Sequence, residues 1–574
     1  MVDDYGVELK SGRYGGLNVS LISIGGDESS SLSRVYAPQN GREMLAQSIT
    51  DRHYSIVNLS NIPNQYDPYE VVTVRYPGGS SSFRRKPGTS NWTPEYATGA
   101  TYVSGATWDS WVFTDKYGVR VERDKVTYPD GREIFGGQVY SAGADPVIVD
   151  VADVRNNFGF RLRTTNLSPT FVTQAVNMAL NYCNNDLTTQ CQGLQGVRSG
   201  SVQRSSRTQV NLTNAAGELT QVVLEPIEAF DSEPTCYGPN GQPCQWNGTK
   251  WTYYYPSQVI FPGSASPNIA MSYMRYGTPG SATHNEILVN HVDVNGVSVG
   301  YNNVYSPTGS WGGPNGYQVT VSSVAGGQIQ LNAHSRSLTV PAWPRGNLNL
   351  ERVTNGLSQT TSFVYNAMGT VSRATYPEGN SVEYKFDSRY NVTEVIRHPK
   401  TGASETATTT RYEYMPSCNV ATQNYCNLPT AAVDPKGNRT EYTYNSRGQI
   451  LTTTGAAPTA GAARPVTTYT YTMRTAYILD SGGGVVAAGS PISMLTRKSE
   501  CRTTQNCAGT ADEIVTEYDY GPTSGPNNLL RRGVTVKAAN SAGQMEVHRT
   551  CYRYNYFGDK ISETSPNAGL ASCP

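Results

Sequence analysis

Apolar and polar residues alternate along much of the chain, which predicts short β-strands joined by tight turns. Residues 292–299 give the clearest pattern, because apolar residues alternate on both sides of Asn295-Gly296. Asn-Gly favours a two-residue hairpin turn, since both residues tolerate a positive φ. The same alternation in residues 111–121 and 253–261 predicts further strands.

Three segments depart from this pattern. Residues 171–182 contain neither Gly nor Pro, and their apolar spacing fits either a helix or a strand. Because they end at Cys183, one member of a cysteine pair, we expect a strand that leads into a loop. Residues 78–90 and 455–465 are rich in small residues and Pro, and we expect both to be flexible insertions.

The composition excludes a mostly helical protein. The 574 residues include 56 glycines and 33 prolines, which cost about 1 and about 3 kcal/mol each inside a helix. The 45 basic and 45 acidic residues balance, so the clustered positive charge of a nucleic-acid-binding protein is not expected. No apolar run reaches the roughly 18 residues of a membrane-spanning helix, so no span is expected.

Ten cysteines fall into five pairs that are close in sequence, and we interpret each pair as a disulfide that closes a hairpin or loop. The pairs are Cys183 with Cys191, Cys236 with Cys244, Cys418 with Cys426, Cys501 with Cys507, and Cys551 with Cys573. A zinc site is disfavoured, because no Cys-x-x-Cys occurs and the six histidines lie away from the pairs. Reduced core thiols remain the alternative.

Disulfides indicate an oxidising compartment, so we expect a secreted or cell-envelope protein. The chain opens with Met1-Val2-Asp3-Asp4, whereas a secretory signal begins with basic residues followed by apolar ones. The two observations agree if the chain lacks its natural N-terminus, and this is our expectation.

The second half of the chain repeats an aromatic-x-aromatic step followed by Asn or Asp and then by Gly. The repeat signature comprises Tyr365, Asn366 and Gly369; Tyr384, Phe386 and Asp387; Tyr442, Tyr444, Asn445 and Gly448; and Tyr552, Tyr554, Asn555 and Gly558. A second signature lies between the copies, at residues 376–380 and 433–438, with a degenerate form at 128–132. Such self-similarity indicates a repeat architecture.

Each part of the repeat has a physical reason. Residues two apart on a strand share a face, so both aromatic rings lie on one side of the sheet. Asn or Asp then caps a turn with its side chain, and Gly supplies the positive φ that ends it. Tyrosine suits this role because its ring can be buried while its hydroxyl reaches a partner. One unit is therefore one hairpin.

These residues resemble the RHS, or YD-repeat, family, whose repeat reads Tyr-x-Tyr-Asp-x-x-Gly-x-(Leu/Val). The resemblance covers residues 361–563 and is strongest in the tandem at 363–387 and in the unit around Tyr442. It implies an all-β fold, in which successive antiparallel hairpins form a long, curved or spiralling sheet that is part of a shell. In many members the shell encloses a C-terminal toxin, and others are surface proteins, some with carbohydrate affinity.

The motif at which family members cleave off their C-terminal toxin is not found in this sequence, and neither is a toxin domain. The segment Asp434-Pro435-Lys436-Gly437-Asn438 reads as a turn between repeats, and no boundary motif or further domain precedes Pro574. We therefore expect an N-terminal or truncated portion of a longer protein. Its expected divisions are residues 1–140 with degenerate repeats, 141–350 with two cysteine-bracketed hairpins, and 351–574 with the repeats.

Catalytic motifs are also not found: the sequence has no Gly-x-Ser-x-Gly, no phosphate loop and no His-Glu-x-x-His. Adjacent acidic residues such as Asp512-Glu513 suit solvated turns. We expect no enzyme activity, no cofactor and no metal, and interpret the chain as a non-catalytic scaffold whose partner is an enclosed C-terminal toxin. The alternatives are a cell-surface adhesin or carbohydrate-binding module with surface glycans as partners, and an enzyme with an unfamiliar site in residues 1–350.

Overall fold

The computed structural model describes most of the chain. The described residues are 7–8, 13–14, 19–25, 31–38, 47–51, 59–61, 70–76, 79–86, 88–94, 99–105, 110–122, 124–137, 147–149, 153–167, 169–185, 190–191, 197–230, 250–276, 286–306, 316–323, 328–335, 348–355, 357–366 and 370–573. The structural statements below concern these residues.

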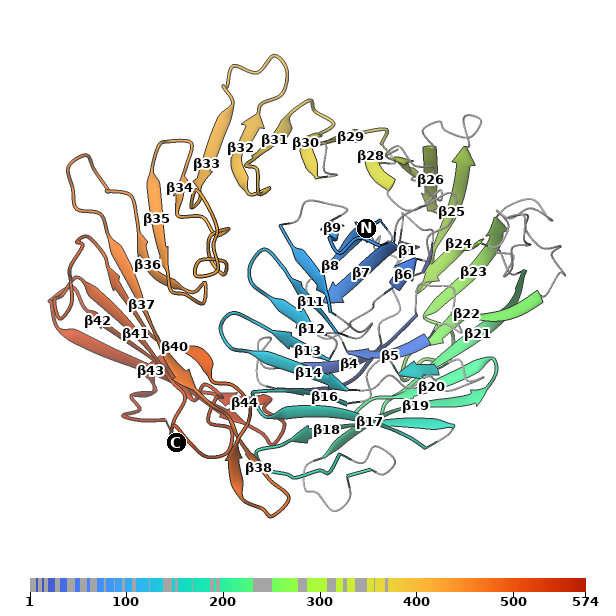
Figure 1. Ribbon diagram of the computed structural model, residues 1–574, viewed down its shortest axis with the longest axis horizontal. Helices are drawn as coiled ribbons and strands as arrows, with labels where there is room; N and C mark the ends of the chain where they lie inside the picture. Colours follow the sequence, from blue (N-terminus) through green and yellow to red (C-terminus); the bar gives the residue numbers. More distant parts are fainter. Residues whose placement is uncertain are drawn as a thin grey trace.

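The fold is all-β, and one long sheet dominates it (Figure 1). Within the described residues this sheet has 32 strands, and their spatial order follows the sequence from β10 to β44, omitting β15 and the hairpin β38–β39. Each strand pairs antiparallel with the next. The prediction of successive antiparallel hairpins in a long curved sheet is thus confirmed.

The first half of the main sheet comprises β10 (Thr101–Ser104), β11 (Trp111–Thr114), β12 (Arg120–Glu122), β13 (Lys125–Thr127), β14 (Glu133–Gly137), β16 (Asp153–Asn156), β17 (Phe160–Asn166), β18 (Thr170–Asn177), β19 (Arg198–Ser206), β20 (Gln209–Thr213), β21 (Leu219–Phe230), β22 (Lys250–Ile260), β23 (Ile269–Tyr276), β24 (Glu286–Val294), β25 (Val297–Ser306), β26 (Gly316–Ser323), β27 (Gln328–Ser335) and β28 (Leu348–Thr354).

The second half comprises β29 (Thr360–Tyr365), β30 (Val371–Thr375), β31 (Ser381–Phe386), β32 (Val392–His398), β33 (Thr408–Glu413), β34 (Ala431–Val433), β35 (Arg439–Tyr444), β36 (Ile450–Thr454), β37 (Val466–Arg474), β40 (Ile492–Cys501), β41 (Glu513–Asp519), β42 (Gly533–Ala539), β43 (Met545–Tyr554) and β44 (Lys560–Glu563). A short 3-10 helix, η1 (Pro566–Ala568), follows.

Smaller sheets accompany the main one. One contains β3 (Val19–Ile24), β4 (Leu32–Pro38), β5 (Gln47–Asp51) and β15 (Val147–Val149); a second contains β6 (Leu59–Asn61), β7 (Glu70–Tyr76), β8 (Gly79–Arg85) and β9 (Thr93–Pro94); two hairpins are β1 (Val7–Glu8) with β2 (Arg13–Tyr14), and β38 (Tyr477–Leu479) with β39 (Val485–Ala487).

The main sheet follows a coil. In Figure 1 the strands pass outward from β11 through β22 and β28 and then round through β33 to β43, and β1 and β7 lie inside the ring. The last strands come back beside the region of β17 and β18, where the Gly25 N–H donates to the Phe557 carbonyl at 2.9 Å. Residues far apart in sequence therefore meet along one line.

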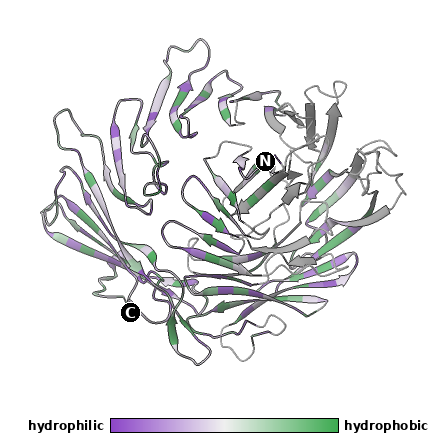
Figure 2. Ribbon diagram, viewed as in Figure 1, coloured by the Kyte–Doolittle hydropathy of each residue, from purple (hydrophilic) through white to green (hydrophobic). Residues whose placement is uncertain are grey.

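The hydrophobic core lies between the inner strands and the first part of the coil. Leu21 and Ile24 of β3 are 0–1% exposed and belong to the same buried cluster as Phe160 and Leu162 of β17. β3 also contacts β18, β19 and β20. Figure 2 shows hydrophobic and hydrophilic residues interspersed along the strands, as expected when only one face of a sheet is covered.

The repeat region is different, because few of its side chains are fully buried. Between residues 360 and 474 the buried ones are Ala374, Ser381, Asn391, Thr422, Cys426 and Ala431. Most others are half-buried. This part of the sheet is therefore a wall one layer thick.

Most local predictions agree with these strands. Residues 292–299 form the predicted hairpin, with φ of 52° at Asn295 and 83° at Gly296. Residues 171–182 form most of β18 and the turn after it.

The prediction for residues 78–90 is partly wrong. Residues 79–85 form β8, which pairs with β7, and Phe83 is fully buried. Burial of the Phe83 side chain thus holds in place a segment whose other residues are mostly small and polar.

The main sheet contains strands from all three predicted regions, and its strand order continues from β14 to β16 and from β27 through β28 to β29. Their boundaries stay a prediction from sequence character. In the described part of the chain, no helix has the length and apolar character needed to cross a bilayer.

The turn glycines give a stability prediction with a matched control. Gly448 has φ of 77°, and a Cβ there would lie 2.5 Å from the Asn424 carbonyl oxygen. Gly437 has φ of 86° with nothing within 4 Å of such a Cβ. We expect Gly437→Ala to lower the free energy of unfolding by about 1–2 kcal/mol through backbone strain alone, and Gly448→Ala to lower it clearly more. Urea unfolding monitored by tyrosine fluorescence measures both, and equal losses would contradict the close approach.

Candidate functional site

A five-residue turn closes the repeat hairpins. In the unit at 445, the Asn445 Oδ1 accepts hydrogen bonds from the N–H of Arg447 (2.9 Å) and of Gln449 (3.1 Å). The Asn445 N–H donates to the Gln449 carbonyl at 2.9 Å, and the Gly448 N–H donates to the Asn445 carbonyl at 3.0 Å. The Asn side chain thus does the work of a backbone partner, which is why this position takes Asn or Asp.

The same turn recurs through the described chain. Its first residue, whose side-chain oxygen accepts from the second and fourth following N–H groups, is Asp115, Asn156, Asn214, Asn355, Asp387, Asp434, Asn445, Asp480, Asn540 or Asn555. The fourth residue has a positive φ in every case, even where it is Ser358 or Tyr390. Asn366 caps the same way toward the Thr370 N–H at 3.1 Å, and Gly369 lies outside the described residues.

Sequence reasoning missed the copies at Asp115, Asn156, Asn214, Asn355, Asp480 and Asn540, because no Tyr-x-Tyr precedes them. A search of the sequence for Asn or Asp followed three positions later by Gly would have found several of them, such as Asp115 with Gly118 and Asn156 with Gly159. The repeat turn is therefore common to both halves of the sheet, whereas the aromatic pair belongs to the second half.

The aromatic pairs share one face of the wall. In β35, Tyr442 and Tyr444 are half-buried while Thr443 between them is exposed, as alternation on a strand requires. β31 shows the same pattern for Tyr384 and Phe386. A register shift precedes the last aromatic residue of each unit, at Tyr365, Phe386, Tyr444 and Tyr554.

The second tyrosine of a pair fastens its strand to the preceding chain. Its hydroxyl donates to a backbone carbonyl: Tyr414 to Val392 at 2.9 Å, Tyr444 to Pro429 at 2.7 Å, Tyr520 to Leu495 at 3.1 Å and Tyr554 to Arg531 at 2.7 Å. Phenylalanine could not make this bond, which gives a physical reason for tyrosine at these four positions.

The opposite face of the wall carries ion pairs, most of which join different strands, while Arg439 and Glu441 lie on the same strand, β35. Arg439 contacts Glu413 at 2.5 Å and Glu441 at 2.7 Å, and Arg464 contacts Glu441 at 2.8 Å. Further pairs are Lys385 with Glu394, Arg411 with Glu394, Arg497 with Glu513, and Lys537 with Glu517. The exposed pairs among these stabilise by about 0–1 kcal/mol each, and those that join strands favour the correct strand register.

Glu513 corrects the expectation that Asp512-Glu513 suits a solvated turn. It is 5% exposed, and its carboxylate accepts from the Ser499 hydroxyl, the Gly509 N–H and the Arg497 guanidinium. These bonds, that from Ser499 first, hold the pKa of Glu513 below its usual value. The carboxylate is buried because its partners replace water.

Contacts between the two ends of the coil form a line that we call the seam, joining residues 25–198 to residues 424–559. At its centre, the Asn157 Nδ2 donates to the Gly131 carbonyl at 2.8 Å and to the Ser490 carbonyl at 2.9 Å. The Asn157 Oδ1 accepts from the Glu133 N–H at 2.8 Å, and the Ser490 hydroxyl donates to the Glu133 carboxylate at 3.0 Å. Glu133 and Asn157 are 2–4% exposed.

The seam continues on both sides of this centre. Toward the last hairpin, the Asn177 Nδ2 donates to the Tyr556 carbonyl at 2.8 Å, and the Arg198 guanidinium lies 3.8 Å from the centre of the Phe557 ring. Toward the earlier repeats, the Asn427 Nδ2 donates to the Lys116 carbonyl at 2.8 Å. Buried polar contacts of this kind specify one docking geometry.

Four of the predicted cysteine pairs are disulfides in the structure. The Cα–Cα distances are 5.7 Å for Cys183–Cys191, 5.4 Å for Cys418–Cys426, 5.4 Å for Cys501–Cys507 and 5.3 Å for Cys551–Cys573. Cys236 and Cys244 lie outside the described residues. The Cys418–Cys426 loop precedes Asn427 and so lies at the seam.

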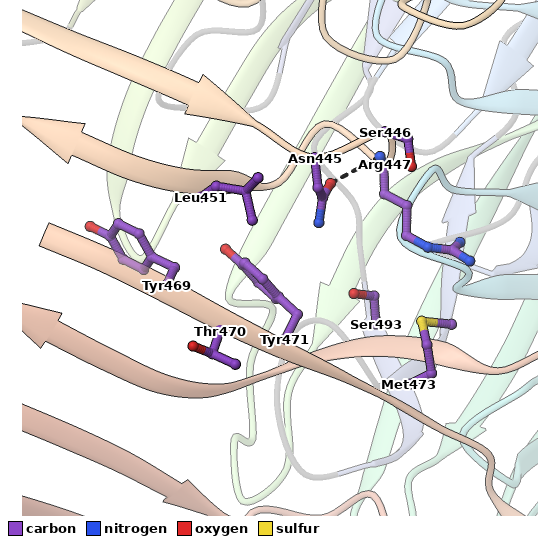
Figure 3. Close-up of a pocket in the computed structure, with 9 residues that line it drawn as sticks. All are labelled: Asn445, Ser446, Arg447, Leu451, Tyr469, Thr470, Tyr471, Met473 and Ser493. Carbon is purple, nitrogen blue, oxygen red and sulfur yellow. Dashed lines mark hydrogen bonds between the residues drawn. The ribbon is translucent and has the colours of Figure 1, made fainter.

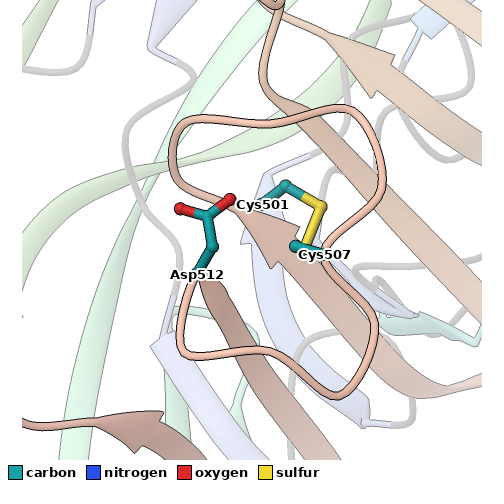
Figure 4. Close-up of side chains that lie close together, drawn as sticks. All are labelled: Cys501, Cys507 and Asp512. Carbon is teal, nitrogen blue, oxygen red and sulfur yellow. A yellow bond between two sulfur atoms is a disulfide. The ribbon is translucent and has the colours of Figure 1, made fainter. Parts of the chain in front are cut away.

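One acidic side chain lies beside a disulfide, but the group is not a metal-ligand set. Figure 4 shows Asp512 next to Cys501 and Cys507. Both sulfurs are bonded to each other, so neither is a thiolate. The Asp512 carboxylate accepts from the hydroxyls of Thr503 and Thr504 at 2.8 and 2.7 Å, which fixes the loop.

Hollows lie both at the seam and along the repeats. A hollow of about 500 Å³ at the seam is lined by side chains that include Arg120, Tyr128, Glu133 and Asn424. Its carboxylate, Glu133, pairs with Lys125 at 2.7 Å. A second hollow, of about 360 Å³, lies beside β37 and contains Tyr469 and Tyr471 (Figure 3).

No protein-family model matches the chain, and no curated protein matches it. Solved structures that resemble it include TcdB2-TccC3-TEV, at 12% identity over 93% of this chain with a TM-score of 0.38, and TcdB2-TccC3 without its hypervariable C-terminal region, at 11% identity over 93% with a TM-score of 0.18. The chain spans 23% and 30% of the length of those chains. At these TM-scores the likeness supports no argument, and the conclusions below rest on the residues and contacts described above.

The tyrosine hydroxyl bonds give a second prediction. Tyr444→Phe removes the bond to the Pro429 carbonyl, and we expect it to lower the free energy of unfolding by about 0.5–1.5 kcal/mol. Tyr442→Phe is the matched control on the same strand, because the Tyr442 hydroxyl has no partner among the described residues, and we expect little change. Urea unfolding of both variants checks this, and similar losses would show that the hydroxyl bond is not what holds the strand.

The same residues predict a loss of stability in alkali. Burial raises the pKa of Tyr414 and of Tyr444 to about 12, from 10.0 for a free side chain. A group whose pKa is raised by folding stabilises the fold fully below the unfolded pKa, and this contribution disappears as the pH rises through the folded pKa. We expect the unfolding midpoint to fall between about pH 10 and pH 12, and to fall less in a Tyr414→Phe, Tyr444→Phe double variant. Equal slopes in wild type and variant would contradict the assignment.

Proposed function

We propose that this chain is a non-catalytic β-sheet scaffold of a secreted or cell-envelope RHS-repeat protein. In this proposal it forms part of a wall that, in the longer protein, encloses a C-terminal toxin. The observation that carries the proposal is the seam, since a single sheet that coils and then locks onto its own beginning makes a rigid wall.

The contacts of the charged side chains support the proposal that the wall is not catalytic. In the described wall, the carboxylates of Glu394 and Glu413 pair with cations on other strands, and that of Glu441 pairs with Arg439 on its own strand. The buried carboxylates Glu133 and Glu513 are held by several partners. Groups bound in this way stabilise the wall and are not poised for proton transfer.

The disulfides support export. Four short loops of a chain of this size are closed by disulfides, and such bonds persist in oxidising compartments. A seam made of buried polar contacts also suits a wall that must open, because each contact is directional and is lost once the two sides part.

The test uses the product of the complete gene and a seam variant. We expect any domain that follows the repeats to resist added protease in the wild type and to be digested in Asn157→Ala, which removes the amide that joins Gly131 to Ser490. Asn438→Ala, on an exposed turn away from the seam, is the matched control and should behave like the wild type. Limited proteolysis with mass spectrometry follows the domain.

Rapid digestion of that domain in the wild type would refute enclosure. The adhesin alternative predicts a different result, in which the chain retains a glycan on an array while the following region, if one exists, stays protease-sensitive. The enzyme alternative would require turnover of a substrate that disappears on mutation of Glu133 without loss of fold.

A further inference from the structure

One of the four described disulfides is open to solvent on one side. Cys418 is exposed, whereas its partner Cys426 is fully buried. In the other three disulfides every cysteine is buried or half-buried. Thiol–disulfide exchange begins when a thiolate reaches one sulfur of the bond. Among the described cysteines, Cys418 is therefore the one most accessible to such an attack.

A guanidinium lies against this exposed disulfide. The Arg389 guanidinium donates to the Cys418 sulfur at 2.9 Å and to the carbonyls of Met415 and Cys426. Its other terminal nitrogen lies 3.5 Å from the Asp387 carboxylate, which orients it. A cation beside a sulfur favours the thiolate over the thiol. Arg389 therefore stabilises the reduced form, and a disulfide with a stabilised reduced form is the more easily reduced.

A second disulfide has the cation but not the exposure. The Arg163 guanidinium donates to both sulfurs of the pair Cys183–Cys191, at 2.6 and 3.2 Å. Arg163 is fully buried, and Cys183 is 9% exposed. A reductant has little access to this pair while the surrounding strands stay folded.

The remaining two disulfides lack the cation. A carboxylate oxygen of Asp512 lies within 4.8 Å of both sulfurs of Cys501–Cys507 (Figure 4), and a nearby negative charge disfavours a thiolate. In Cys551–Cys573, the Cys573 sulfur lies 3.9 Å from the Thr550 carbonyl oxygen. Among the described disulfides, exposure and a cation therefore coincide at Cys418–Cys426.

The loop that this disulfide closes lies against the first part of the coil. Asn427, next to Cys426, donates to the Lys116 carbonyl at 2.8 Å across the seam. Asn424, inside the loop, packs so closely on Gly118 that a Cβ there would overlap the Asn424 Oδ1. Both contacts require one loop conformation, and a cross-link restricts the conformations that a loop can adopt.

The same loop borders the centre of the seam. Gln423 and Asn424 line the seam hollow of about 500 Å³ together with Glu133 and Ser490. A loop that moves away would open this hollow and admit water to the contact between Glu133 and Ser490.

We propose that Cys418–Cys426 is a redox-active disulfide, which a dithiol reduces while the other described disulfides stay closed, and that its reduction loosens the seam. A thiolate of the dithiol attacks the Cys418 sulfur, the bond between the two cysteines breaks, and Cys426 leaves and takes up a proton. The second thiol of the reductant then displaces Cys418, which leaves as a thiolate beside Arg389. A stabilised thiolate is the better leaving group.

The exchange balances. Two electrons pass from the dithiol to the protein, and the reductant becomes a cyclic disulfide. One of its two protons goes to Cys426 and the other to water. This inference rests on the seam that carries the proposed function but needs no enclosed domain, so either can fail alone.

The first experiment places the whole chain in mixtures of reduced and oxidised dithiothreitol, alkylates the free thiols after acid quenching, and reads each cysteine pair by mass spectrometry. We expect Cys418–Cys426 to be half-reduced at a ratio of reduced to oxidised reagent at least about tenfold lower than Cys501–Cys507. Arg389→Gln should raise the ratio for Cys418–Cys426 about tenfold, because the thiolate loses its cation. Arg502→Gln is the control, since Arg502 donates only to backbone carbonyls, and it should leave that ratio unchanged.

The direction of the Arg389 effect separates the two roles that this residue could have. If Arg389 only held the loop in shape, Arg389→Gln would loosen the loop and lower the ratio. An unchanged or lowered ratio would therefore overturn the proposal, as would half-reduction of Cys418–Cys426 and Cys501–Cys507 at the same ratio.

The second experiment measures the seam by amide hydrogen exchange. The Ser493 N–H donates to the Asp130 carbonyl at 2.8 Å across the seam. At a ratio that opens Cys418–Cys426 alone, we expect this N–H to exchange at least about tenfold faster while β17 and β18 stay protected. The double variant Cys418→Ser, Cys426→Ser should show the same fast exchange without reductant. The matched variant Cys501→Ser, Cys507→Ser should exchange like the wild type. Unchanged exchange at Ser493 on reduction would overturn the coupling to the seam.

Discussion

The structure depends on one constraint: a sheet one layer thick has no second layer to bury its faces. In most domains, packed layers supply the apolar burial that offsets the entropy of folding. Here the inner strands cover only the first part of the coil, and the repeat wall keeps most of its side chains half-buried. Other interactions must hold that wall, and the structure places them at the turns, at the tyrosine hydroxyls and in the ion pairs of the opposite face.

The turns, the tyrosine hydroxyls and the ion pairs each stabilise a different part of the wall. The Asx side chain satisfies two N–H groups at each turn, so a hairpin end needs no help from outside. The hydroxyl of the second tyrosine reaches the chain that precedes its own hairpin and fixes how successive hairpins meet. The ion pairs act across strands and oppose a slip of register, which would exchange the two faces. The seam then joins the wall to the one part of the molecule that has a true core.

Much of this could be predicted from the sequence, and the reasons are local. The period-two alternation and the Asn295-Gly296 turn specify hairpins, and the repeat of Tyr442, Tyr444 and Asn445 specifies which face the rings share. The four described disulfides follow from spacing alone. The seam could not be predicted, because Asn157 and Ser490 are separated by 333 positions and neither belongs to a recognisable motif.

The central claim is that the coil closes on itself through the seam, and amide hydrogen exchange of the chain tests it most directly. The N–H groups of Gly25, Glu133 and Ser493 each donate across or along the seam, to Phe557, Asn157 and Asp130. We predict that these three amides exchange as slowly as those of β17 and β18 in the core. Exchange at the rate of the exposed turn at Lys436, with β17 and β18 still protected, would show that the wall does not lock onto its beginning.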